Sequence, residues 1–266
     1  MNKTLFLKFA SISFQKQITY RFDYFVGILN GFLYVFIFTS LWSNIYSQQP
    51  QAEHGGFSLT GIITYAVLAM TVRISFSMDD TVIYKKVQDG SVAIDLIRPV
   101  SFFFMNLAEC AGYSFFHIFA RAMPILVISS LMFELAIPVD GFRFFLFTLS
   151  GLLGYLILFM MNYMIGLLAF WFIEVFPFQL FKYGLITLFS GGIVPIDFFP
   201  ETLKPFVMML PFQYVLYTPT VILMGHADVE QALRLIAGQA AWVFVFAAGC
   251  KSAWRAGQRK LVIQGG

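Results

Sequence analysis

The sequence predicts an all-α protein, a polytopic transmembrane helical bundle with about six spans. Hydrophobic residues make up 59% of its 266 residues, charged residues make up only 12%, and the mean hydropathy is +0.78. A soluble domain carries roughly 25% charged residues. The charged side chains are therefore too few to cover a water-exposed surface, and we expect residues 1–266 to form one membrane domain.

Six apolar stretches have about the 20-residue length that a helix needs to cross the hydrocarbon layer. They lie at about 24–46, 59–78, 105–133, 142–172, 179–195 and 232–250. The stretch 142–172 is longer than a span requires, so we expect it to tilt or to project beyond the bilayer. A polar loop at 47–57 separates the first two stretches.

Lysine and arginine are distributed unevenly over the loops, and such residues are enriched in short cytoplasmic loops. With both termini in the cytoplasm, the outer side holds only Arg143, Lys204 and Arg234. The inner side then holds Lys3, Lys8, Lys16, Arg21, Lys85, Lys86, Arg98, Lys182, Lys251, Arg255, Arg259 and Lys260. This imbalance predicts an even number of spans with both ends of the chain inside.

The stretch 79–101, between the second and third spans, is rich in charge. Asp89-Gly90 is a turn signal, Ser91 is suited to cap a new helix, and Pro99 ends it. Two short amphipathic helices are therefore expected on the cytoplasmic face. Apolar or small residues recur at 4-3-4-3 spacing, which is typical of one helix face: Ile83, Val87, Gly90, Ile94 and Ile97. The charged residues around them include Lys85, Lys86, Asp89, Asp95 and Arg98. The segment is either a solvated connector or a docking surface for a cytosolic partner.

Two other segments are expected at the membrane surfaces. Residues 2–22 mix apolar side chains with Lys and Gln, which indicates an interfacial helix in the membrane plane. The apolar segment 196–231 contains several prolines, which remove backbone donors that lipid cannot replace. We expect two short helices there, at about 200–210 and 212–224, as a re-entrant hairpin in the outer leaflet. An ordinary extracellular loop is the alternative.

Polar residues inside spans are costly and are first considered functional. Glu109, His117 and Arg121 share one face of the third span, which allows a proton relay or a structural polar seam. Arg73, near the inner end of the second span, is explained by snorkelling. Asn162 in the fourth span is interpreted as a helix-packing residue.

The motifs of common active sites are absent from the sequence. It contains no G-x-x-x-x-G-K-[ST], H-E-x-x-H, C-x-x-C or G-x-S-x-G. We therefore predict no catalytic, cofactor-binding or metal-binding residues, no enzymatic activity and no nucleic-acid partner. The two cysteines, Cys110 and Cys250, are interpreted as small apolar fillers.

Two stretches resemble a known family. GSVAIDLIRPVSFFFMNLAE, residues 90–109, resembles the cytoplasmic-loop signature of type-two ABC exporter permeases. IVPIDFFPETLKPFVMMLPFQYVLYTPTVILMG, residues 193–225, is similar to the proline-punctuated segment before the last span in a six-span branch of these permeases. That branch was formerly described as a family of unknown function.

The resemblance implies a bacterial inner-membrane permease without its own ATPase. Two permeases, identical or related, would pair and sit on ATP-binding subunits that supply ATP and Mg²⁺. Residues 79–98 would be the coupling helices, and 2–22 the interfacial elbow. The second and fifth spans would line the pathway. The re-entrant segment 196–224 would close the outer exit, with Pro200, Pro205, Pro211, Phe212 and Pro219.

Two other functions stay open from the sequence. One is a proton-coupled secondary transporter that uses Glu109, His117 and Arg121. The other is a membrane scaffold without transport activity. Secondary carriers usually show internal repeats with broken helices in both halves. In this sequence the breaks occur only near the end, which favours the ATP-driven permease. The resemblance implies a cargo among drugs, peptides and glycans.

Overall fold

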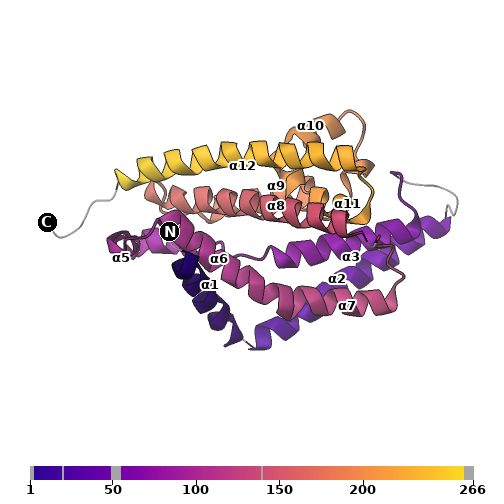
Figure 1. The fold of residues 1–266 in the computed structure, drawn as a ribbon, viewed down its shortest axis with the longest axis horizontal. Helices are drawn as coiled ribbons and strands as arrows, with labels where there is room; N and C mark the ends of the chain where they lie inside the picture. The colour runs from indigo at the N-terminus through magenta and orange to yellow at the C-terminus, as the bar shows by residue number, and fades with distance from the viewer. Residues whose placement is uncertain (1–2, 20, 49–54, 139, 261–266) are drawn as a thin grey trace.

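The computed structural model describes residues 3–19, 21–48, 55–138 and 140–260, and in this part of the chain all regular structure is helical (Figure 1). The predicted all-α class is therefore confirmed. Residues 49–54 of the expected 47–57 loop lie outside the described residues. The α-helices are α1 Lys3–Ile18, α2 Arg21–Gln48, α3 Leu59–Ser75, α4 Val82–Gln88, α5 Val92–Ile97, α6 Phe102–His117, α7 Met123–Met132, α8 Gly141–Leu167, α9 Phe176–Phe189, α10 Lys204–Met209, α11 Tyr217–Met224 and α12 Val229–Gln258. Shorter elements are the π-helix η1 Ile118–Ala122 and the 3-10 helices η2 Leu168–Phe170, η3 Ile196–Phe198 and η4 Pro211–Tyr214.

Among the residues that the structure describes, four helical segments are long and apolar enough to cross a bilayer, as expected of a multi-pass membrane protein. They are Phe25–Gln48, Phe102–Met132, Gly141–Phe170 and Val229–Gln258. These segments match the first, third, fourth and sixth expected spans. They extend roughly along the long axis of the molecule, with α5 near one end and α10 and α11 towards the other (Figure 1). We call these the α5 end and the α10 end.

The second and fifth expected spans correspond to shorter helices. α3 has 17 residues and α9 has 14. At 1.5 Å per residue they rise about 26 Å and about 21 Å, less than the ~30 Å of a hydrocarbon core. The total of six spans therefore stays a prediction.

α9 ends at Phe189, six residues before the expected end of the fifth span at residue 195. The helix cannot continue easily because Gly191 has a φ of +76°, which side chains with a Cβ rarely adopt. The backbone N–H of Tyr217 donates to the carbonyl of Ser190 at 2.9 Å. A distant part of the chain therefore satisfies one of the carbonyls that the helix end leaves free.

The long helices keep large apolar side chains exposed. On α2 these include Leu29, Phe36 and Ile37, and on α12 they include Phe244 and Val245. A soluble protein rarely exposes contiguous apolar surface of this kind. Such surfaces are typical of helices that contact lipid.

Two pairs of helices form much of the bundle. α12 lies along α8 (Figure 1), and the Gln239 side chain of α12 donates to the carbonyl of Ser150 on α8 at 3.0 Å. α1 crosses α6 so closely that a Cβ on Gly112 would collide with the backbone of Ala10. The expected interfacial helix α1 is thus packed against a long helix. η1 joins α6 and α7 into one continuous helical segment.

The segment 196–224 forms four short helical pieces, where two helices were expected. Pro205 lies in the first turn of α10 and Pro211 begins η4, positions that tolerate the missing backbone N–H. Residues 214–216 pack against Val72 on α3 and Ile157 on α8, and are buried with them. Residues 214–216 therefore pack into the bundle, and the re-entrant placement of the segment in the outer leaflet stays a prediction.

Candidate functional site

The two short helices between α3 and α6 form as the sequence predicts, separated by a turn at residues 89–91. Gly90 adopts a φ of +75° there. The backbone N–H of Ser91 donates to the Asp89 carboxylate at 2.9 Å, which holds the pKa of that carboxyl below its usual range. Ser91 is the residue before α5, but its own side chain makes no capping hydrogen bond.

The turn divides the predicted apolar face, so its members do not share one surface. Ile83 on α4 is buried over Gly166, where a Cβ would collide with it. Val87 on α4 is half-buried. On α5 the side chains of Ile94 and Ile97 are 60% and 84% exposed, while Val92 and Asp95 are buried. The continuous stripe was therefore a wrong interpretation, because the left-handed residue at 90 reorients the second helix.

Four charged side chains, here called the inner charge cluster, fix α4 and α5 to α6. Lys86 Nζ lies 2.9 Å from Glu109 Oε2 and 3.3 Å from Asp95 Oδ2. Arg98 Nη1 lies 3.1 Å from Asp95 Oδ1. In these contacts each cation lies beside a carboxylate of a neighbouring helix or turn. They hold α4 and α5 against α6, which is the first part of the long segment Phe102–Met132.

The three polar residues expected on one face of the third span lie in different surroundings. Glu109 belongs to the inner charge cluster. His117 is buried at the end of α6, with its ring centroid 4.5 Å from that of Tyr113. Arg121 lies in η1 and packs over Gly27 of α2. Since Glu109 and His117 are two turns apart on α6, about 12 Å, they make no direct contact.

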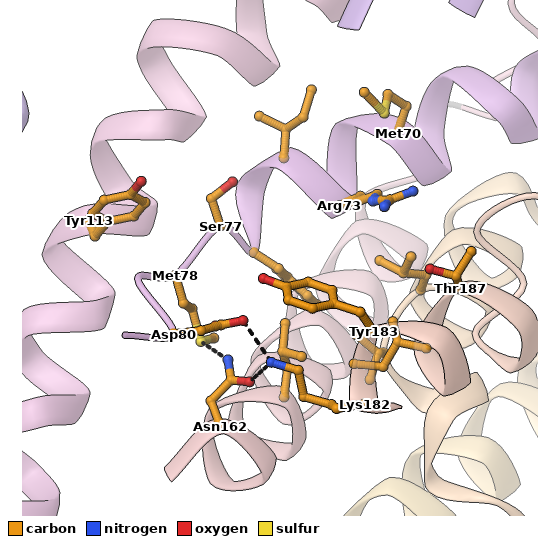
Figure 2. Close-up of a pocket in the computed structure, with 16 residues that line it drawn as sticks. Met70, Arg73, Ser77, Met78, Asp80, Tyr113, Asn162, Lys182, Tyr183 and Thr187 are labelled. Atoms are coloured by element: carbon orange, nitrogen blue, oxygen red, sulfur yellow. Dashed lines mark hydrogen bonds and ion pairs between the residues drawn. The ribbon is translucent and has the colours of Figure 1, made fainter. Parts of the chain in front are cut away.

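A second charged group lies between the α3–α4 connection, α8 and α9. Lys182 is only 5% exposed, and its Nζ lies 2.7 Å from Asp80 Oδ2. Lys182 also donates to Asn162 Oδ1 on α8 (Figure 2). The neighbouring Asp79 has another role, because its carboxylate accepts from the backbone N–H of Thr81 at 2.9 Å, just before α4. This buried pair thus joins α9 to the connection that leads into α4.

The buried pair lines a cavity of about 310 Å³ between α3, α6, α8, α9 and residues 215–216. Arg73, in the last turn of α3, also lines it, and Figure 2 shows the residues around this space. The rest of the lining is largely apolar or aromatic: Met70, Ile74, Phe76, Met78, Tyr113, Leu158, Tyr183, Ile186, Val215 and Leu216. A second cavity of about 230 Å³ lies beside α1 and is lined by Lys16, Lys86 and Glu109.

Comparison with known protein families shows what kind of molecule this bundle is. A family described as ABC-2 family transporter protein matches residues 28–265, which is most of the chain. The chain belongs to the ABC-2 transporter family. The resemblance inferred from residues 90–109 and 193–225 is thereby confirmed. A search of the curated proteins found no match.

ABC-2 family members are permeases, so the chain is a membrane transport component of an ABC transporter. The family implies an ABC ATPase as a partner in general. The helix pair α4–α5 lies on the connection between α3 and α6. It is short, amphipathic and held firmly to the long helices.

In this ABC-2 protein the residues expected at the outer gate lie in two environments. Pro200 and Pro205 are exposed, whereas Pro211 and Pro219 are buried. Phe212 is half-buried, with its ring centroid 6.3 Å from that of Phe189 at the end of α9. The second half of the segment is therefore the half that packs into the bundle.

The sequence interpretation missed the Lys182–Asp80 pair. Lys182 was counted with the cytoplasmic loop charges, but it lies in α9 and is buried. Pro177 is the signal that would have corrected this, because proline favours the first turn of a helix and here lies at the start of α9. That start puts Lys182 more than one turn inside the helix.

Proposed function

We propose that the chain is the permease subunit of an ATP-driven exporter in the bacterial inner membrane, with both termini in the cytoplasm. Two permeases, identical or related, would form the translocation pathway. ATP and Mg²⁺ would be bound by separate ATPase subunits. The family and the uneven distribution of Lys and Arg support this arrangement.

The observation that carries the proposal is the contrast within α4–α5. Ile94 and Ile97 project from α5 as exposed apolar side chains. The inner charge cluster holds the same helix pair to α6, while α4 also contacts α8. A partner that gripped Ile94 and Ile97 would therefore move two long helices, which is what a mechanical coupler needs.

The pathway in this proposal follows α3 and α9, with residues 196–224 closing its outer end. Tyr65 on α3 donates to the carbonyl of Gly191 at 2.6 Å, and Tyr217 donates to Asp197 at 2.8 Å. At the α10 end, the first bond ties α3 to the segment just after α9, and the second ties α11 to η3. Opening an exit there would require them to break together.

A proton relay through Glu109, His117 and Arg121 receives less support. Glu109 is bound by Lys86, and it is two helical turns away from His117. Substitution Glu109→Gln should therefore loosen the α4–α6 contact and lower coupling without a shift in the pH profile of transport. A changed pH profile with intact ATPase coupling would favour the secondary transporter instead. A scaffold without transport activity would show neither ATP-dependent export nor stimulated ATP hydrolysis.

The direct test is co-purification with an ATPase encoded by a neighbouring gene. Wild-type chain should retain the ATPase subunit, and Ile97→Asp should lose it because the exposed apolar contact becomes charged. Met209→Asp is the control, since Met209 is 74% exposed but lies on α10, away from α5 (Figure 1). Ile97→Asp should stay monodisperse in detergent. Retention of the ATPase by Ile97→Asp, or equal loss in both variants, would contradict the assignment to α5.

A further inference from the structure

The cavity between α3, α8 and α9 carries one more positive charge than its own residues neutralise. Lys182 and Arg73 are cationic, and Asp80 is the carboxylate among the lining residues. Asp80 is bound to Lys182 at 2.7 Å. Arg73 forms no hydrogen bond or ion pair with any residue that the structure describes, so its guanidinium is available to a ligand.

The remaining surface of the cavity suits an apolar chain. Met70, Phe76, Leu158, Ile186 and Leu216 all contribute to its wall. A ligand that contacts both the Arg73 guanidinium and the apolar wall has an anionic group and an apolar portion. An arginine fork fits a carboxylate or phosphate with two parallel hydrogen bonds, which a lysine cannot reproduce.

Residues 215–216 close the cavity on the side of η4. They belong to the buried cluster that includes Val72 and Ile157, and the backbone N–H of Tyr217 is bound to Ser190 just beyond them. The volume of about 310 Å³ is at the small end of ligand pockets, which span roughly 300–1,000 Å³. It fits a headgroup and part of one chain, and it excludes a glycan chain of several sugars.

We propose that this cavity binds a single-anion amphiphile, with Arg73 binding the anionic group and the apolar wall holding its chain. The inference rests on the proposed transport function and narrows the substrate class. An apolar chain with one anionic group could come from two sources, a cargo molecule or an anionic phospholipid of the inner leaflet. The experiment therefore has an arm for each source.

The test uses the full chain in nanodiscs and a photoactivatable 12-carbon alkyl phosphate. The matched probe carries a trimethylammonium group on the same chain, which separates charge recognition from partitioning into lipid. The phosphate probe should label α3 or α9 saturably, and the ammonium probe should not. Equal saturable labelling by both probes would overturn the proposal.

The variants locate the anion contact. Arg73→Gln should raise the half-saturating concentration of the phosphate probe by about tenfold or more, because a hydrogen bond to a charged group is lost. Arg73→Lys should give a smaller increase. Lys251→Gln is the charge-matched control, since Lys251 is exposed on α12 and does not line the cavity. An unchanged value in Arg73→Gln would overturn the assignment.

Nanodiscs of phosphatidylcholine and of phosphatidylglycerol distinguish the two sources. If phosphatidylglycerol suppresses labelling, a phospholipid is the natural occupant, and if labelling is equal, the site is free for cargo. Both results support an anionic-amphiphile site. The labelling needs no ATPase, so its failure with intact ATPase association would remove only this inference. Loss of ATPase association in the wild-type chain would instead contradict the proposed function.

Discussion

The two ends of the molecule satisfy their polar groups in different ways. At the α5 end, charged side chains bind one another, as in the Lys86–Glu109 and Lys182–Asp80 pairs. At the α10 end, side chains donate mainly to carbonyls of irregular backbone, as Tyr65 does to Gly191 and Tyr34 to Gly192 at 2.9 Å. The first arrangement fixes regular helices to each other. The second makes irregular backbone tolerable inside a bundle.

The strongest test of this difference is the buried pair at the α5 end. Lys182→Met should destabilise the protein by about 3–5 kcal/mol, because removal of one partner leaves the Asp80 charge buried and unpaired. The double variant Lys182→Met with Asp80→Asn should lose less, since no charge then stays unpaired. Thermal unfolding in detergent measures both. A double variant that is less stable than the single one would show that the pair itself, rather than the orphaned charge, dominates.

At the α10 end the sharpest test concerns backbone conformation. Gly191→Ala should cost roughly 2–4 kcal/mol, because φ is +76° and the new Cβ would lie 2.8 Å from atoms of Tyr65 and Tyr217. Gly184→Ala on α9 is the control, since nothing lies within 4 Å of its Cβ position. The control should be neutral or stabilising by up to about 1 kcal/mol. Equal thermal stability of the two variants would contradict the structure at residues 190–192.

A smaller effect is expected from one hydroxyl group. Tyr65→Phe should cost about 1–2 kcal/mol, because the buried carbonyl of Gly191 loses its 2.6 Å donor without loss of the aromatic packing. Unfolding in detergent measures the loss. Hydrogen exchange at residues 189–192 should rise in the variant, and unchanged exchange there would show that another donor replaces the tyrosine.

The smallest effect is expected where an ion pair is exposed. Arg234 and Glu230 pair on α12 with 72% and 74% of their side chains exposed. Arg234→Gln should change stability by less than about 0.5 kcal/mol, and any effect should vanish at high salt. Arg234 lies near the start of α12, at the α10 end, so a loss comparable to that of Lys182→Met would show that ion pairs stabilise both ends equally and would contradict the comparison.

The sequence predicted those parts of the fold that depend on local chemistry. Long apolar stretches predicted the four long segments, and the Asp89-Gly90 turn together with Pro99 predicted the two short helices. It did not predict that α9 would end at Phe189, because the left-handed conformation of Gly191 stops the helix there and the freed carbonyl of Ser190 accepts from a distant donor, Tyr217. Apolar content alone cannot distinguish a buried irregular segment from the end of a span.

The candidate site was predicted only in part, for a related reason. Ile94 and Ile97 were identified from their spacing. The prediction that they share one face with Ile83 was wrong, because Gly90 adopts a left-handed conformation between the two helices. Lys182, Asp80 and Asn162 are far apart in the sequence and meet only through packing. No periodicity within one helix reveals such a meeting.

The π-helix η1 gives one membrane segment two orientations. A π turn accommodates an extra residue, which rotates everything beyond it by about 100° relative to an unbroken α-helix. Before η1, α6 contacts α1, α3 and α8, and after it α7 contacts α2 and α3. Deletion of a single residue from Ile118–Ala122 would therefore rephase Ile125, which is buried beside Val35 and Val67, away from those neighbours while leaving the hydrophobicity of the segment almost unchanged.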